Sequence, residues 1–225
     1  MPHASKLPDP LFEQVLAWTV EAHGEARLRA ARLAFENATG AMVEGASDYE
    51  ARISHFWEQH LCSGDPGPMA AFAAAHPELS ASERRALAGW LRSHRSLFTF
   101  EGLRGEQGER GVLHDRVLGG HFEFHTRPEE RSLRPGDSFD ARLVALDDAL
   151  WLSPGRVYHP PEAHAALDAL LARIDRNALA HGALLDALLL MRSRFLQFAS
   201  IRAEHVYHER SLALIKPSAS SRLDA

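Results

Sequence analysis

The sequence predicts an α+β protein: an N-terminal helical region over residues 1–96, a small antiparallel β meander or barrel over residues 97–155, and a C-terminal helical region over residues 156–215. Two observations predict this class. Apolar residues recur at helical spacing on both sides of the central stretch. Within that stretch, residue types alternate with a period of two, and turn residues separate the short runs. A Ser-rich tail over residues 216–225 is expected to be mobile.

Helix start signals divide the N-terminal region into four expected helices. Asp9-Pro10 begins the first, which extends to about Asn37, with Asp as the N-cap and Pro in the first turn. Ser47–Glu50 and Ser80–Glu83 have the spacing of capping boxes and begin the second and fourth helices, on either side of a short helix over Met69–Ala75. The second helix is expected to bury Tyr49, Ile53, Phe56, Trp57 and Leu61. The fourth is expected to bury Leu87, Trp90, Leu91 and His94.

Short alternating runs mark the strands of the central module. His121–His125 alternates strictly, which places its two Phe on one face and His121, Glu123 and His125 on the other. Ser138–Leu146 and Ala149–Leu152 are two further strands, joined by a tight Asp-Asp turn. One face of the longer of these strands is expected to carry Phe139, Ala141, Leu143 and Ala145.

Apolar spacing predicts two helices after the central module. The first covers Glu162–Ile174. Asn177 is expected to cap the second, which is deeply buried and extends to Phe198. His205–Leu214 continues this helix or forms a last one.

Composition and charge restrict the function classes. The 225 residues carry a net charge of −5 and no basic run, which argues against a nucleic-acid binder. Cys62 is the only cysteine, so no intrachain disulfide and no Cys-based zinc knuckle can form. No secretory signal is evident, and the most apolar segment, Ala178–Met191, is too short to span a bilayer. We therefore expect a cytoplasmic protein that does not bind membranes.

Two histidine clusters are candidate metal sites. If the central run is a strand, His121, Glu123 and His125 share a face and offer the imidazole and carboxylate ligands that zinc or a similar divalent ion takes, with His114 as a further ligand. The alternative, which we favour, is a solvated outer face over two core Phe. His205 and His208, each with a Glu one helical turn away, could bind a metal or sense pH; the alternative is a polar helix face.

Enzymatic chemistry finds little support in the sequence. No Gly-x-Ser-x-Gly elbow, Walker loop or dinucleotide-binding loop is present. Cys62 lies outside any Cys-His signature and is read as a structural thiol. No catalytic residue and no bound cofactor are therefore assigned, and a non-enzymatic role is favoured over an enzymatic one.

Part of the chain, from Phe56 to about Leu152, resembles a poorly characterised bacterial family. The residues that carry the likeness are Phe56-Trp57-Glu58, Pro68–Phe72, Leu79–Arg84, Trp90, Leu97-Phe98, Arg131–Asp137 and Ala141–Leu143. The resemblance implies a helical part followed by a small β module. Some members of that family carry a Cys-rich, zinc-binding tail of the SEC-C type. With Cys62 as the only cysteine, no metal role of that tail is expected here.

Three function hypotheses follow from the sequence. The first is a non-enzymatic protein-interaction or adaptor module that binds another protein through its β module. The second is a divalent-metal-binding protein or metal-dependent enzyme that uses His121, Glu123 and His125. The third and weakest is a β module that binds single-stranded nucleic acid. The sequence does not indicate the partner or the oligomeric state.

Overall fold

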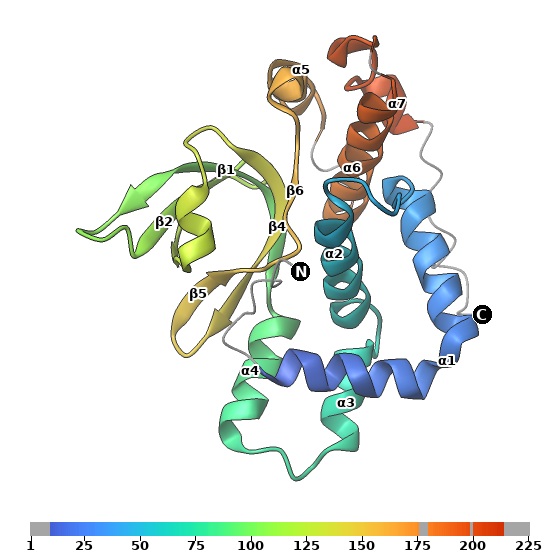
Figure 1. Cartoon of the computed structure of the whole chain (residues 1–225), viewed down its shortest axis with the longest axis vertical. Helices are drawn as coiled ribbons and strands as arrows, with labels where there is room; N and C mark the ends of the chain where they lie inside the picture. Colours follow the sequence, from blue (N-terminus) through green and yellow to red (C-terminus); the bar gives the residue numbers. More distant parts are fainter. Residues whose placement is uncertain (1–9, 176–179, 199, 214–225) are drawn as a thin grey trace. The chain divides into compact units, whose positions relative to one another are not determined.

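The computed structural model describes residues 10–175, 180–198 and 200–213. Contacts divide the chain into two units: Met1–Arg32 with Met42–Tyr158, and Leu33–Ala41 with His159–Ala225. The predicted caps at Asp9 and Asn177 and the predicted tail over residues 216–225 lie outside the described residues. The α+β class is confirmed, with helices before and after a central sheet (Figure 1).

Four helices precede the sheet, as predicted. They are α1 (Pro10–Thr39), α2 (Tyr49–Cys62), α3 (Pro68–Ala75) and α4 (Ala81–Leu91). The backbone of α1 leaves helical geometry at Gly24, where φ is +68°. A residue without a Cβ adopts this conformation at little cost, so the helix changes direction there.

One of the two predicted capping boxes is present. Ser80 accepts a hydrogen bond from the backbone N–H of Glu83, and the Glu83 carboxylate accepts one from the backbone N–H of Ser80. The box predicted at Ser47 is wrong, because the N-cap of α2 is Asp48 and its side chain makes no capping hydrogen bond.

The sheet contains six strands in the order β1-β2-β3-β5-β4-β6. Their bounds are β1 (His94–Arg104), β2 (Arg110–Asp115), β3 (His121–His125), β4 (Ser138–Leu146), β5 (Ala149–Leu152) and β6 (Val157–Tyr158). β1 also pairs with β4, so the first five strands close on themselves. The pairs are antiparallel except β3 with β5, which run parallel where His125 pairs with Trp151. The antiparallel module that we predicted therefore contains one parallel pair.

This connectivity is that of a Greek-key barrel of the OB type, a five-stranded barrel with a meander at its start. A 3₁₀ helix, η1 (Pro128–Ser132), connects β3 to β4. Apolar side chains, most of them large, fill the barrel interior: Phe98, Phe100, Leu113, Phe124, Leu133, Phe139, Ala141, Leu143 and Leu152. The odd-numbered residues of β4 face this interior as predicted, except for the exposed Ala145 at the end of the strand.

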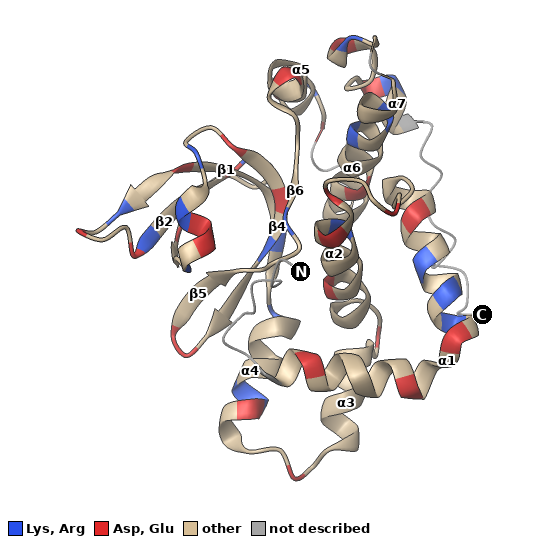
Figure 2. Cartoon of the chain, viewed as in Figure 1, with Lys and Arg blue, Asp and Glu red and all other residues tan. Residues whose placement is uncertain are grey.

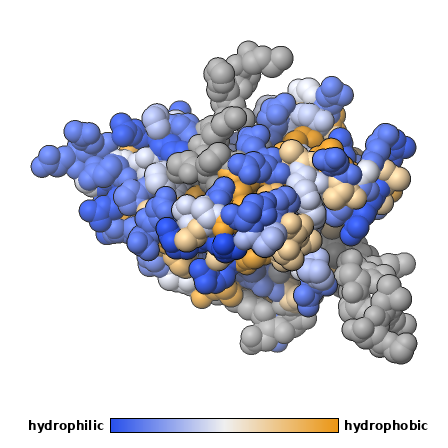
Figure 3. All heavy atoms as spheres, turned by 90° about the horizontal axis from the view of Figure 1, so that it is seen from below, coloured by the Kyte–Doolittle hydropathy of each residue, from blue (hydrophilic) through white to orange (hydrophobic). Residues whose placement is uncertain are grey.

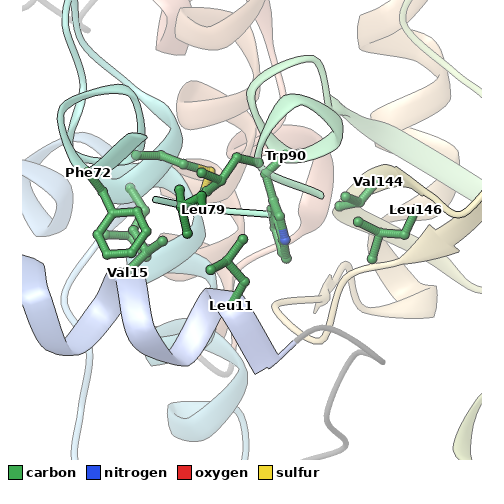
Figure 4. Close-up of a cluster of buried hydrophobic side chains, with 10 residues drawn as sticks. Leu11, Val15, Phe72, Leu79, Trp90, Val144 and Leu146 are labelled. Atoms are coloured by element: carbon green, nitrogen blue, oxygen red, sulfur yellow. The ribbon is translucent and has the colours of Figure 1, made fainter. Parts of the chain in front are cut away.

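A second apolar core joins the helices to the outside of the barrel (Figure 4). It contains Leu11, Val15, Leu61, Met69, Phe72, Leu79, Leu87, Trp90, Val144 and Leu146. The helix α4 approaches β4 so closely that a Cβ on Gly89 would lie 2.0 Å from the carbonyl oxygen of Ala145. The prediction that Leu87 and Trp90 face inward is confirmed.

Two residues assigned to the inner face of α4 are placed differently. Leu91 is 44% exposed, because the helix ends there. His94 already belongs to β1, where its Nε2 bonds the Asp115 carboxylate at 2.7 Å. The sheet therefore begins three residues earlier than the expected boundary at Leu97.

The buried face of α2 also differs from the prediction. Its buried residues are Arg52, His55, Phe56, Glu58 and Leu61. Tyr49, Ile53 and Trp57, which we expected to be buried, are only half-buried. Helical periodicity identifies the apolar face of a helix. In α2, however, polar residues are buried too, and they pack against polar residues of β1 and β4.

The C-terminal helices are shorter than predicted. They are η2 (Pro161–Ala163), α5 (His164–Leu171), α6 (His181–Gln197), η3 (Ala203–His205) and α7 (Glu209–Ala213). As predicted, α6 is largely buried, since Leu184, Leu185, Leu188 and Leu189 are each at most 2% exposed. No helix of the described ranges is both long enough and apolar enough to cross a membrane.

Candidate interaction face of the β barrel

The outer face of β2 and β3 is the candidate site, and it contains the predicted His-x-Glu-x-His run. His121, Glu123 and His125 are exposed, whereas Phe124 is fully buried in the barrel, so the predicted alternation is confirmed. β2 pairs with β3 in a register that sets His114 opposite His121 and Arg110 opposite His125. Residues opposite each other in an antiparallel pair share a face. Arg110, His114, His121, Glu123 and His125 therefore share one face, with the buried Val112 opposite Glu123.

Ion pairs occupy the charged groups of this face. The Glu123 carboxylate accepts hydrogen bonds from Arg104 at 2.7 Å and from Arg110 at 3.3 Å. The Nε2 atom of His121 lies 3.0 Å from the Glu101 carboxylate. The paired groups lie on three strands, β1, β2 and β3. The surface is therefore a network of paired charges and does not present an array of free ligands.

Aromatic rings cover the rest of the face. The His114 and His121 rings stack with centroids 4.9 Å apart. His125 packs on Trp151 of β5 with centroids 5.5 Å apart. Trp and Arg, both present here, are enriched at protein interfaces.

The metal interpretation gains no geometric support from this arrangement. Two guanidinium groups already surround the Glu123 carboxylate. Across the described ranges, 10–175, 180–198 and 200–213, no group of three or more His, Cys, Asp or Glu side chains is arranged to hold a metal ion. The metal site at His121, Glu123 and His125 stays a prediction.

The second histidine cluster does not lie on one helix. His205 ends η3, whereas His208 lies in the turn before α7. The ring of His208 is engaged by Ser211, whose backbone N–H donates to its Nδ1 at 3.2 Å. A metal or pH-sensing role for these two residues likewise stays a prediction.

Acidic loops flank the candidate face. The loop between β1 and β2 exposes Glu106 and Glu109, and the turn between β4 and β5 exposes Asp147 and Asp148. Figure 2 shows both connections in red. Backbone N–H groups of Glu109 and Gln107 lower the pKa of the Glu109 carboxyl, so it is ionised at neutral pH. In OB-type barrels the corresponding two loops border the ligand-binding face.

Within the unit that contains the barrel, the described helices make their main contacts with strands other than β2 and β3. Their main contacts with the sheet are those of α4 with β4 and of α2 with β6. The main contacts of β2 and β3 are instead with the neighbouring strands of the barrel. None of these helices therefore has a main contact with the polar surface over β2 and β3.

A buried polar network holds α2 against the opposite side of the barrel. Arg95 and Asp140 form a two-point ion pair, with N–O distances of 3.0 and 2.8 Å. The Glu58 carboxylate accepts hydrogen bonds at 2.7 Å from the Ser153 hydroxyl and from the backbone N–H of Gly155. Because these side chains are buried, the network serves the fold and is not an open site.

Sequence reasoning missed this network, although its signal was present. Even-numbered residues of β4, among them Asp140 and Arg142, alternate with the core residues and lie on the other face of the strand. In the structure, α2 covers these two residues and α4 covers Val144 and Leu146 of the same face. Because helices cover this face of the strand, the Asp140 carboxylate depends on a partner distant in sequence. That partner is Arg95, 45 residues away.

His55 makes the stability of this network dependent on pH. Its Nδ1–H donates to the Gly155 carbonyl at 2.8 Å, and burial lowers the pKa of the ring from 6.5 to about 4. Between these values the unfolded chain binds a proton that the folded chain does not, so stability falls as the pH falls. Burial raises the pKa of Glu58, so this carboxyl contributes stability that is lost as the pH rises. This effect opposes that of His55, and comparison with a variant that changes only His55 cancels it.

We therefore expect lowering the pH from 7 to 5 to destabilise the wild type by about 2 kcal/mol more than the His55→Asn variant. Asn retains a donor for the Gly155 carbonyl but does not titrate. Urea unfolding of both proteins at the two pH values measures the difference. Equal losses in the two proteins would show that His55 is not held neutral in the fold.

Comparisons with known proteins found no match: no family model, no curated protein and no solved structure is similar to the chain. The likeness to the bacterial family therefore stays a prediction.

Proposed function

We propose that the chain is a non-enzymatic protein-interaction module that binds a partner protein on the outer face of β2 and β3. The observation that carries the proposal is the polar face with which no helix of the same unit has a main contact. The ion pairs of Glu123 lie at its centre, the stacked His114 and His121 rings at one end, and acidic loops at its edges. The barrel topology supports this by analogy, since OB-type barrels bind extended ligands on the same face.

The electrostatics of the face favour a protein over a nucleic acid. Many OB-type barrels bind single strands, but such sites offer free cations to the phosphates. Here Arg104 and Arg110 are paired with Glu123, and four carboxylates stand on the flanking loops. The chain as a whole carries a net charge of −5. These carboxylates complement a partner surface that carries lysine or arginine.

Neutralising the flanking loops tests the proposal. The rim variant combines Glu106→Gln, Asp147→Asn and Asp148→Asn; Asn suits the positive φ of 48° and 61° at the two Asp positions. The control variant combines Glu13→Gln, Glu25→Gln and Glu50→Gln, which remove the same charge from exposed helix positions. The wild type and both variants serve as immobilised bait for a nuclease-treated extract of the source cells.

We expect a specific protein to be retained by the wild type and the control, and about tenfold less by the rim variant. Retention that is equal for all three baits, or no retained protein, would refute the proposed face. A protein retained from an untreated extract but not from the nuclease-treated one would identify a nucleic-acid binder instead.

A further inference from the structure

We infer that a hollow between α1, α3 and the start of α4 binds a cationic side chain, the ammonium or guanidinium group of a lysine or arginine in a peptide. The hollow is separate in sequence from the barrel face and goes beyond the proposed function. Its volume of about 630 Å³ is within the range of small-ligand pockets. Figure 3 shows the molecule from below, turned by 90° from the view of Figure 1, with hydrophobic residues at the surface among hydrophilic ones.

Aromatic rings form one wall of the hollow. Phe72 is buried and stacks on His76 with centroids 4.0 Å apart. Trp18 of α1 meets both rings edge-on, at 5.7 Å from Phe72 and 6.1 Å from His76. Trp18 is half-buried, so part of its indole remains open to the hollow. The face of an indole is the best aromatic partner for a cation.

Carboxylates also line the hollow. Glu21 and Glu78 are exposed there, and neither has a hydrogen bond or ion pair with any residue that the structure describes. A third carboxylate, that of Glu83, caps α4 through Ser80. Figure 2 shows that the first half of α1 carries acidic residues and no basic ones.

The hydrogen bond of His76 gives the hollow an acceptor as well. Its Nδ1 lies 2.8 Å from the carbonyl oxygen of Phe72 and must donate a proton to it. In the neutral ring, Nε2 therefore carries a lone pair. The residues that line the hollow include no Lys or Arg. The nearby Arg84 directs its guanidinium to the Pro77 carbonyl at 3.0 Å.

These features converge on one ligand chemistry. An aromatic face, two carboxylates without a cationic partner in the described chain and a ring acceptor all favour a positively charged group that donates hydrogen bonds. An anionic ligand would be repelled, and a purely apolar ligand would leave the carboxylates without a partner. The stem of a lysine or arginine matches the mixed apolar and polar lining.

A titration followed by NMR tests the inference with the full chain. The chain has four Trp, and the indole N–H signal of Trp18 is identified by its loss in a Trp18→Phe variant. The probes are N-acetyl-arginine amide, N-acetyl-lysine amide and the neutral isostere N-acetyl-citrulline amide. We expect the two cationic probes to move the Trp18 signal saturably and citrulline amide to leave it in place.

The carboxylates are tested by a Glu21→Gln, Glu78→Gln variant against a Glu13→Gln, Glu50→Gln control, with thermal melting used to confirm that both are folded. We expect the first variant to raise the Kd for arginine amide about tenfold and the control to leave it unchanged. An unmoved Trp18 signal, equal binding of citrulline amide, or an unchanged Kd in the first variant would overturn the inference. None of these outcomes bears on the barrel face, because the two sites share no residue.

Discussion

We expect the Asp140→Ala variant to lose about 3–5 kcal/mol of unfolding free energy. Asp140 is 1% exposed and holds the guanidinium of Arg95, itself 7% exposed, through two hydrogen bonds. Removing the carboxylate leaves the positive charge of Arg95 buried beside His55 and Arg142. The cost arises from that uncompensated charge more than from the lost attraction between the pair.

Urea unfolding at neutral pH measures this loss. The matched control is Glu25→Ala, which breaks the ion pair with Arg29 on the surface of α1, where the two side chains are 84% and 76% exposed. We expect the control to change the unfolding free energy by less than about 1 kcal/mol. Replacing both buried partners, with Asp140→Leu and Arg95→Met, should recover most of the loss. A loss below about 1 kcal/mol for Asp140→Ala would mean that the pair is not buried as described.

We expect the Trp90→Ala variant to lose a similar amount, about 3–5 kcal/mol. Trp90 is 1% exposed at the centre of the core that joins α1, α3 and α4 to β4. Its ring packs on Phe12 with centroids 4.5 Å apart. Truncation removes these contacts and leaves a cavity that the surrounding helices can fill only in part.

Chemical unfolding with the neighbouring Leu91→Ala variant as control measures the effect. Leu91 belongs to the same helix but is 44% exposed, so we expect a loss of less than about 1 kcal/mol. If the two variants lost equal stability, the helices would not pack on the barrel through Trp90.

Local signals predicted much of the fold. The alternation in His121–His125, the Ser80 capping box and the spacing of Leu87 and Trp90 each depend on residues close in the chain, and each is confirmed. The buried face of α2 could not be predicted in the same way. Periodicity counts Arg52, His55 and Glu58 as surface residues, and their burial depends on partners in distant strands.

For the same reason, only part of the candidate face could be predicted from the sequence. The exposure of His121, Glu123 and His125 follows from strand alternation. The ion pairs of Glu123 with Arg104 and Arg110 depend on the register of three strands, which no local pattern determines. The parallel pairing of β3 with β5 is equally non-local, so the closure of the barrel had to come from the structure.

The barrel closes through the pairing of β3 with β5 and of β1 with β4, and the proposed binding face of β2 and β3 depends on this closure. Backbone proton–proton NOEs across these two pairs test the closure. The structure predicts NOEs of a parallel pair between His125 and Trp151, and of an antiparallel pair between Leu97 and Asp140. Absence of the first set, with β3 and β5 exchanging their amide protons as free edges, would contradict the closed barrel and the binding face that depends on it.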